Sequence, residues 1–277
     1  MPKDFRATTL ERSIGRQLAW WRDERGLSLA EAGHRVGFSS AKLSTMENAV
    51  QPSMPLDIMA LGYVYNVPTP EWQALVLRAE YAKTARVSGG SAEPLFDPIA
   101  DFASLVFEVT ELRAFTTDLV PTGLQLRSYA HAAGSPERIA QLSKVREAWA
   151  TRLSDKDPPM VEAVFPEAVL RPLVGGPRVM KAQLLHLMEI SEHSTVTVQV
   201  IPVVAGAYPA MGCPFTLLGF PHRQHNDVAY LETAIKGEYV EDQALVEQLA
   251  QRFAELQRIA LSPDESLELI AEAAADL

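Results

Sequence analysis

The first 85 residues have apolar positions at intervals of three and four, the spacing expected of amphipathic helices. This pattern predicts five short helices, over residues 10–25, 28–37, 39–48, 56–65 and 70–83. Ser28 followed by Glu31 is a capping-box pattern, so the second helix should start at Ser28. Pro70 suits the first turn of the fifth helix. The five helices predict one all-α domain.

The third predicted helix differs from its neighbours because its face is small and polar. Within GFSSAKLSTMEN, residues 37–48, the inward positions of the helix are Leu43 and Met46. It follows the second helix across a tight turn at residues 36–39, and the small residues Ala32 and Gly33 let the two helices approach closely. This arrangement indicates a helix-turn-helix. An ordinary helical hairpin with a solvated polar face is the alternative, since it has the same spacing.

The second helix of a helix-turn-helix lies in the DNA major groove, with its first residues at the base edges. We therefore expect base contacts from the outward residues Ser39, Ser40, Ala41, Lys42, Ser44 and Thr45. Short hydroxyls donate or accept hydrogen bonds, and a lysine reaches guanine acceptors or a phosphate. We expect phosphate contacts from Arg16, Arg22, Ser28 and Asn48.

After residue 86 the pattern changes to a mixture of helix and strand. Residues 87–98, VSGGSAEPLFDP, predict a linker between a helix-turn-helix domain at 1–86 and a larger domain at 99–277. Strands are predicted over 112–117, 160–165, 196–201, 215–220 and 228–232. Helices are predicted over 136–153, 177–191 and 242–259, and a last one begins at Ser262. Their irregular alternation predicts an α+β fold.

The net charge of −10 is unevenly distributed along the chain. Residues 1–85 carry ten Lys or Arg and nine Asp or Glu, whereas the remainder carries 15 and 26. Because phosphate repels an acidic surface, DNA contact should be confined to the N-terminal domain. No apolar run is long enough for a membrane span, and a lone cysteine, Cys213, is compatible with a reducing cytoplasm.

The N-terminal segments RDERGLS and VGFSSAKLSTMEN resemble the Xre-type, phage-repressor-like DNA-binding domain. The resemblance implies that Glu47 is structural and ties the recognition helix to its surroundings. Leu29 stands where the family often has a phosphate-binding glutamine, and Ala19 stands where many members have an arginine. Backbone affinity should therefore depend on Arg16, Arg22, Lys42 and helix N-termini.

The C-terminal segments resemble the long domain of WhiJ-like or Scr-type antitoxin-like actinobacterial regulators. The resemblance rests on LVPTGLQLRSYAHA, EAVLRPLVGGPRVMKAQLLHLMEI, VTVQVIPVVAGAYPAMGCPFTLLGF, AYLET and ALSPDES. It implies a transcriptional regulator, often encoded beside a small partner protein. The segment from Pro121 to Leu126 departs from the family's usual Pro-Gly-Leu-Leu-Gln-Thr, so a ligand or partner site there should differ in specificity.

Residues 203–212 are apolar, rich in small side chains and placed between two predicted strands. Such a loop walls a pocket or a partner groove, or else is a buried crossover. We take as a candidate ligand or partner site Tyr208, Met211, Pro121, Gln125 and Tyr129. No catalytic, cofactor or metal site is expected, since the motif His222-x-x-His225-x-Asp227 fits a solvated turn and no phosphate-binding glycine motif occurs.

These observations predict that the chain is a sequence-specific transcriptional regulator that binds double-stranded DNA as a homodimer. Its C-terminal domain would dimerise the chain and sense a small-molecule effector or a small partner protein. The main alternative is an antitoxin-like interaction module that binds the partner protein alone. Salt separates the two hypotheses, because DNA binding weakens steeply with ionic strength and an apolar protein interface does not.

Overall fold

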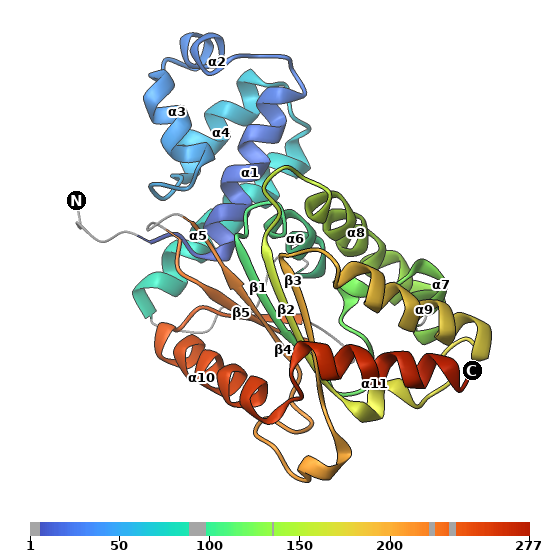
Figure 1. Ribbon diagram of the computed structural model, residues 1–277. Helices are drawn as coiled ribbons and strands as arrows, with labels where there is room; N and C mark the ends of the chain where they lie inside the picture. Colours follow the sequence, from blue (N-terminus) through green and yellow to red (C-terminus); the bar gives the residue numbers. More distant parts are fainter. Residues whose placement is uncertain (1–5, 89–97, 135, 222–224, 233–236) are drawn as a thin grey trace. The chain divides into compact units, whose positions relative to one another are not determined.

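Two units make up the chain in a computed structural model, which describes residues 6–88, 98–134, 136–221, 225–232 and 237–277 (Figure 1). The first unit comprises Met1–Asp97 and His222–Asn226, and the second comprises Pro98–Pro221 and Asp227–Leu277. The expected linker, residues 87–98, falls mostly outside the described residues. At its ends, residues 87–88 belong to the fifth helix and Pro98 begins the sixth.

The first unit contains the five expected helices, which confirms the all-α N-terminal fold. They are α1 (Thr9–Asp23), α2 (Leu29–Val36), α3 (Ser40–Glu47), α4 (Pro55–Val64) and α5 (Thr69–Ser88). Local chemistry fixes their starts, because side-chain hydroxyls of Thr8, Ser28 and Ser39 cap α1, α2 and α3. A single apolar core joins them, and its fully buried members include Ile14, Leu18, Leu43, Ile58 and Leu61.

The second unit is built on a six-stranded mixed sheet, which confirms the expected α+β domain. Its strands are β1 (Glu111–Phe115), β2 (Met160–Pro166), β3 (Val196–Ile201), β4 (Phe215–Gly219), β5 (Val228–Glu232) and β6 (Gly237–Val240). The strand order is β3-β2-β1-β4-β5-β6, and the pairs β1/β2 and β2/β3 are parallel while the other neighbours are antiparallel.

Helices cover both faces of this sheet. They are α6 (Pro98–Leu105), α7 (Arg127–Ala133), α8 (Pro136–Leu153), α9 (Pro177–Ile190), α10 (Gln243–Ile259) and α11 (Pro263–Ala275). Successive strand residues point to opposite faces, so Ala114 joins the core under α6, α8, α9 and α11, and Phe115 joins the core under α10. Figure 1 shows α10 on one side of the sheet and α8, α9 and α11 on the other.

Several elements of the second unit carry too weak a pattern to be expected from the sequence. The helix α7 has seven residues and no side-chain cap, and only Tyr129 and Ala130 in it are buried. The edge strand β6 has four residues, and short 3-10 turns occur at η1 (Thr122–Leu124), η2 (Glu167–Leu170) and η3 (Val203–Ala205). The helix α6 begins in what the composition indicates is linker.

Candidate nucleic-acid interface

The turn between α2 and α3 is held in one geometry by two glycines. Gly37 ends α2 with a positive φ of 78°, a conformation that favours glycine. A Cβ on Gly33 would lie 2.5 Å from the backbone oxygen of Phe38, so only glycine allows α2 this close to the turn. The amide of Phe38 donates to the Gly33 carbonyl at 2.9 Å. The expected close approach at Gly33 is therefore present.

The helix α3 turns its two bulky residues inward, as its spacing predicts. Leu43 is fully buried and Met46 is buried, whereas Ser40 and Ala41 are exposed. Lys42, Ser44 and Thr45 are half-buried at the edge of the exposed face. The outer surface of α3 thus consists of small side chains and one lysine, which would allow the helix backbone to come close to a groove.

Two contacts from α1 fix the C-terminal end of α3. Arg22 binds Glu47 through both carboxylate oxygens, with Nε to Oε1 and Nη2 to Oε2 each at 2.7 Å. A Cβ on Gly15 would lie 2.5 Å from the Glu47 carbonyl oxygen, so α1 packs directly on the end of α3 there. The expected structural role of Glu47 agrees with this geometry. The orientation of α3 is set by its neighbour as well as by its own core residues.

This ion pair bears on the expected phosphate contact of Arg22. Its guanidinium also donates to Asp23 at 2.6 Å and to the Leu27 carbonyl at 2.8 Å, and its side chain is only 13% exposed. The hydrogen bonds to Glu47 raise the arginine pKa above its ordinary value. Because these four hydrogen bonds use all but one of its N–H groups within the domain, we propose that Arg22 positions α3 and does not contact phosphate.

The other residues expected to contact phosphate remain at the surface or near it. Ser28 is exposed and its hydroxyl donates to Glu31 at 2.7 Å, which together with the Ser28 amide lowers the Glu31 pKa. Asn48 is exposed and donates to the Ser44 carbonyl at 2.8 Å. Arg16 is half-buried on α1. Arg35, which no sequence pattern indicates as a phosphate contact, is exposed in the last turn of α2.

Some residues expected at base edges also have internal partners. The Ser39 hydroxyl accepts the Lys42 amide at 3.1 Å as the cap of α3, and the Thr45 hydroxyl donates to the Lys42 carbonyl at 2.7 Å. The Lys42 ammonium lies 2.8 Å from Asp57 and 3.6 Å from the centre of the Phe38 ring. Its side chain is 41% exposed, and exposed pairs of this kind are weak, so a phosphate can compete for it.

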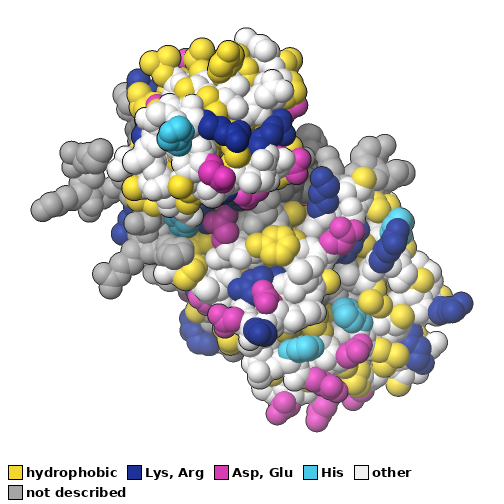
Figure 2. Space-filling view, turned by 90° about the horizontal axis from the view of Figure 1, so that it is seen from above, with side chains coloured by type: hydrophobic (Ala, Val, Ile, Leu, Met, Phe, Trp, Pro, Cys, Tyr) yellow, Lys and Arg dark blue, Asp and Glu magenta, His cyan; other side chains and the backbone are white. Residues whose placement is uncertain are grey.

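The charge on this face is modest. The basic residues of α2 and α3 are His34, Arg35 and Lys42. Figure 2 shows the molecule from above, with Lys and Arg side chains side by side in its upper part and with His, Asp or Glu and hydrophobic side chains close to them. Because counterion release scales with the number of phosphates neutralised, one such face supplies only part of the affinity of a typical operator complex.

The five residues expected to form a C-terminal ligand site do not form a single group. Tyr208 packs on the core under α10, with its ring centre 6.2 Å from that of Phe115. Tyr129 belongs to the core of the opposite sheet face, is fully buried and accepts the Val120 amide at 3.4 Å. Met211 is 63% exposed. Pro121 and Gln125 line clefts on the face where Tyr129 lies, and Gln125 and Tyr129 both hydrogen-bond to Val120, the residue before Pro121.

The described residues contain no group of three His, Cys, Asp or Glu placed to hold a metal ion. The motif at His222 lies partly outside the described residues, and its Asp227 accepts the Phe220 amide at 3.2 Å. Within the same described ranges, no helix combines the length and apolar character needed to cross a membrane.

Comparison with known protein families gives two matches. The family model described as a helix-turn-helix domain matches residues 13–75, which span α1 to the first part of α5. The model described as Domain of unknown function (DUF5753) matches residues 99–272, which span the sheet and its helices. No curated protein and no solved structure matches the chain significantly.

Proposed function

We propose that this chain, which belongs to the DUF5753 family and carries an N-terminal helix-turn-helix domain, is a sequence-specific DNA-binding regulator of transcription. The helix-turn-helix domain itself suggests DNA binding and transcription regulation. The observation that carries the proposal is the exposed polar face of α3, held in a fixed orientation by Gly15 and Arg22. A solvated hairpin with no groove to enter would not need the orientation of its outward helix to be fixed in this way.

In this proposal Ser40, Lys42 and Ser44 contact base edges, and Ser28, Arg16 and Arg35 contact phosphates. Ser39 and Thr45 stabilise α3 and do not contact bases, because their hydroxyls hydrogen-bond to the backbone of Lys42. The amides at the N-terminus of α2 add a favourable partial charge for a phosphate near Ser28. Modest charge per domain favours two copies on a two-fold-related site, with half-sites about 34 Å apart.

We place the chain with the Xre-type regulators whose long C-terminal domain resembles that of the WhiJ-like and Scr-type antitoxin-like proteins, acting in the cytoplasm and without catalysis. Dimerisation and the sensing of an effector or a small partner protein are assigned to residues 99–277, with residues 87–98 as the joint. The acidic balance of that region supports its separation from the DNA contact.

The test measures binding of the full chain to genomic duplex fragments by fluorescence anisotropy at several salt concentrations. We expect the affinity to fall steeply as the salt concentration rises. The double variant Lys42→Ala plus Ser44→Ala should bind at least tenfold more weakly than the unchanged chain. Lys83→Ala is the matched control, because it removes an exposed lysine of the same unit from α5. An affinity that does not change with salt concentration, or an equal loss of affinity in the α3 variant and in Lys83→Ala, would favour the protein-interaction alternative.

A further inference from the structure

An open cleft of about 720 Å³ lies in the second unit, between α7, α8 and the C-terminal part of α9. Figure 1 shows these three helices close together on the side of the sheet opposite α10. Four aliphatic side chains, all half-buried, contribute to its walls: Leu126, Ile139, Leu153 and Ile190. A cleft of this size accommodates a small organic molecule, and its aliphatic walls favour one with an apolar body.

Two arginines line this cleft without the carboxylate partners that other arginines of the unit have. Four arginines elsewhere in the unit are each paired with a carboxylate: Arg113, Arg152, Arg171 and Arg252. Among the described residues, neither Arg127 nor Arg146 has a carboxylate within ion-pair distance. The Arg146 guanidinium donates one long hydrogen bond, to the Ile139 carbonyl at 3.4 Å. Their other N–H groups are therefore available to an anion in the cleft.

The two guanidiniums lie close enough to affect each other. Burial lowers the pKa of the half-buried Arg146, the nearby Glu147 raises it, and the positive charge of Arg127 lowers it. Burial and a like charge both disfavour a charged group, so an anion bound at Arg127 and Arg146 would offset both effects.

Two carboxylates also line the cleft and would oppose an anion. Glu147 is exposed, and the Glu189 side chain is 80% exposed and lies 3.9 Å from Nδ1 of His186. Water and salt screen charges that are so exposed. Arg127 is exposed as well, so the half-buried Arg146 should contribute most to the attraction of an anion. The other titratable residues of the lining are histidines, which add positive charge when protonated: His131, His186 and His193.

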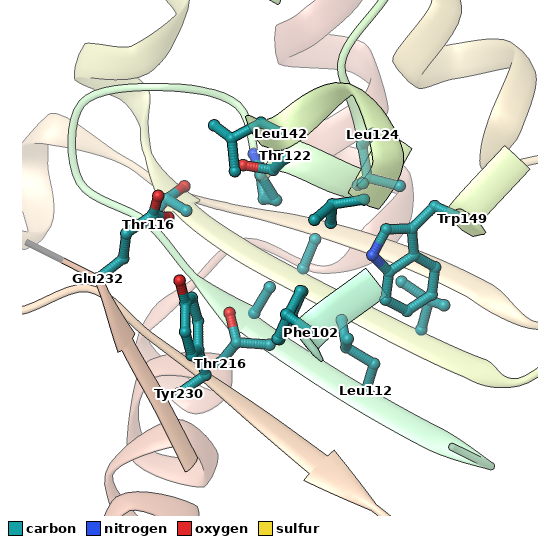
Figure 3. Close-up of a pocket in the computed structure, with 16 residues that line it drawn as sticks. Phe102, Leu112, Thr116, Thr122, Leu124, Leu142, Trp149, Thr216, Tyr230 and Glu232 are labelled. Atoms are coloured by element: carbon teal, nitrogen blue, oxygen red, sulfur yellow. The ribbon is translucent and has the colours of Figure 1, made fainter. Parts of the chain in front are cut away.

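The wall of the cleft at η1 is closely packed. Gly123 lines the cleft and also a smaller cavity of about 60 Å³ that adjoins it. A Cβ on Gly123 would lie 2.7 Å from the Trp149 ring, so η1 lies directly on the indole. Figure 3 shows Trp149 and Leu124 at the end of the smaller cavity away from Thr116. Because only Gly123 separates the indole from the cleft, the indole N–H signal should respond to a ligand bound there.

We propose that this cleft binds a small organic anion, with its acidic group at Arg146 and Arg127 and its apolar body against the aliphatic walls. Guanidinium groups bind carboxylate and phosphate through paired N–H donors, so both acidic groups suit the site. The site lies on the face of the sheet opposite Tyr208. Its role as the effector site of a regulator rests on the proposed function, whereas the binding itself does not.

Four probes with the same six-carbon chain test the charge preference: hexanoate, hexyl phosphate, hexan-1-ol and hexylamine. Binding to the full chain at pH 7 is followed by the NMR shifts of the Trp149 indole N–H and the Arg146 Nε–H. We expect the tighter of the two anions to bind at least tenfold more tightly than the alcohol, and the amine to bind no more tightly than the alcohol. The tighter anion also identifies the acidic group that the site prefers.

Charge variants locate the acidic group of the ligand. Arg146→Gln should weaken the tighter anion at least fivefold and change the affinity for the alcohol less than twofold. Should Arg146→Gln fail to fold, Arg127→Gln decides with at least a threefold loss, because Arg127 is exposed. Glu147→Gln should strengthen the anion, since it removes an opposing charge. The control Arg252→Gln changes an arginine on α10, on the opposite side of the sheet, and should leave every affinity unchanged.

A variant that fills the cleft locates the apolar body. Ala150 is exposed and lines the cleft, so Ala150→Phe puts a ring there without altering the core. It should weaken the anion and the alcohol at least fivefold each, whereas Ala150→Ser should change neither by more than twofold. Equal affinities for anion and alcohol, tighter binding of the amine, or unchanged anion affinity in the arginine variants or in Ala150→Phe overturns the site.

A parallel titration of DNA affinity with the tighter anion separates this inference from the function on which the effector role rests. A change of threefold or more in DNA affinity supports the effector role. Anion binding without that change retains the site and refutes the effector role. Absence of DNA binding by the chain refutes the proposed function, while the NMR titration still decides whether the cleft binds anions.

Discussion

Removal of the Glu47 side chain should destabilise α3. The buried Arg22 guanidinium would lose its bidentate partner and keep Asp23 as its one carboxylate partner among the described residues. Breaking a fully buried pair costs about 3–5 kcal/mol. Here the two side chains are 13% and 8% exposed and Arg22 keeps Asp23 and the Leu27 carbonyl, so Glu47→Ala should cost roughly 2–3 kcal/mol. The matched change Asp23→Ala removes the partner that is 66% exposed and should cost at most about 0.5 kcal/mol.

Hydrogen exchange, followed by mass spectrometry on peptides that cover α1 and α3, measures the local loss of stability in these two helices. The expected loss corresponds to amide exchange about 30- to 150-fold faster in those helices. Adding Arg22→Met to Glu47→Ala should recover most of the protection, since the penalty comes from the unpaired charge. The reasoning fails if Glu47→Ala costs no more than Asp23→Ala, or if the double variant is no more stable than Glu47→Ala alone.

Three further changes test other parts of the structure. Gly15→Ala places a Cβ against the backbone oxygens at the end of α3 and should cost about 1–3 kcal/mol in urea unfolding; a change below 0.5 kcal/mol would contradict the packing. Tyr65 is buried, its hydroxyl has no protein partner among the described residues, and burial raises its pKa to about 12. Because no protein hydrogen bond is lost, Tyr65→Phe should lower the free energy of unfolding by less than about 0.5 kcal/mol. A decrease of more than about 1 kcal/mol would indicate that the hydroxyl binds a water molecule. The Glu167 carboxylate accepts the Val203 amide at 3.0 Å and pairs with Arg171, which lowers its pKa. The ionised carboxylate contributes about 1 kcal/mol to stability above the ordinary glutamate pKa of about 4.3, and this contribution is lost as pH falls through the lowered pKa. Glu167→Gln should therefore lower the melting temperature at pH 7 and leave it unchanged near pH 2. An equal difference in melting temperature between the two proteins at both pH values would refute this account.

The sequence predicts those features of the fold that depend on local chemistry. Ser28 and Ser39 cap their helices because hydroxyls accept the exposed first amides, and Leu43 and Met46 face inward because their spacing matches the helical period. The strand of residues 196–201 follows from β-branched alternation.

Other features depend on contacts between distant parts of the chain. Arg22 and Glu47 are 25 positions apart, so the charge that seemed free for phosphate is used inside the domain. The register of β2, β1 and β4 places Ala163, Ala114 and Thr216 in one row across the sheet, and no local pattern of the sequence predicts that alignment. Composition and resemblance place Tyr208 and Tyr129 in one candidate site, yet the sheet separates them.

Selection of bound duplexes from a random library tests the central claim most directly. The full chain should enrich one motif with two-fold symmetry, Lys83→Ala should enrich the same motif, and Lys42→Ala plus Ser44→Ala should enrich none. Failure of the full chain to enrich any motif, or enrichment of the same motif by the α3 variant, would contradict the assignment of α3 as the helix that reads DNA.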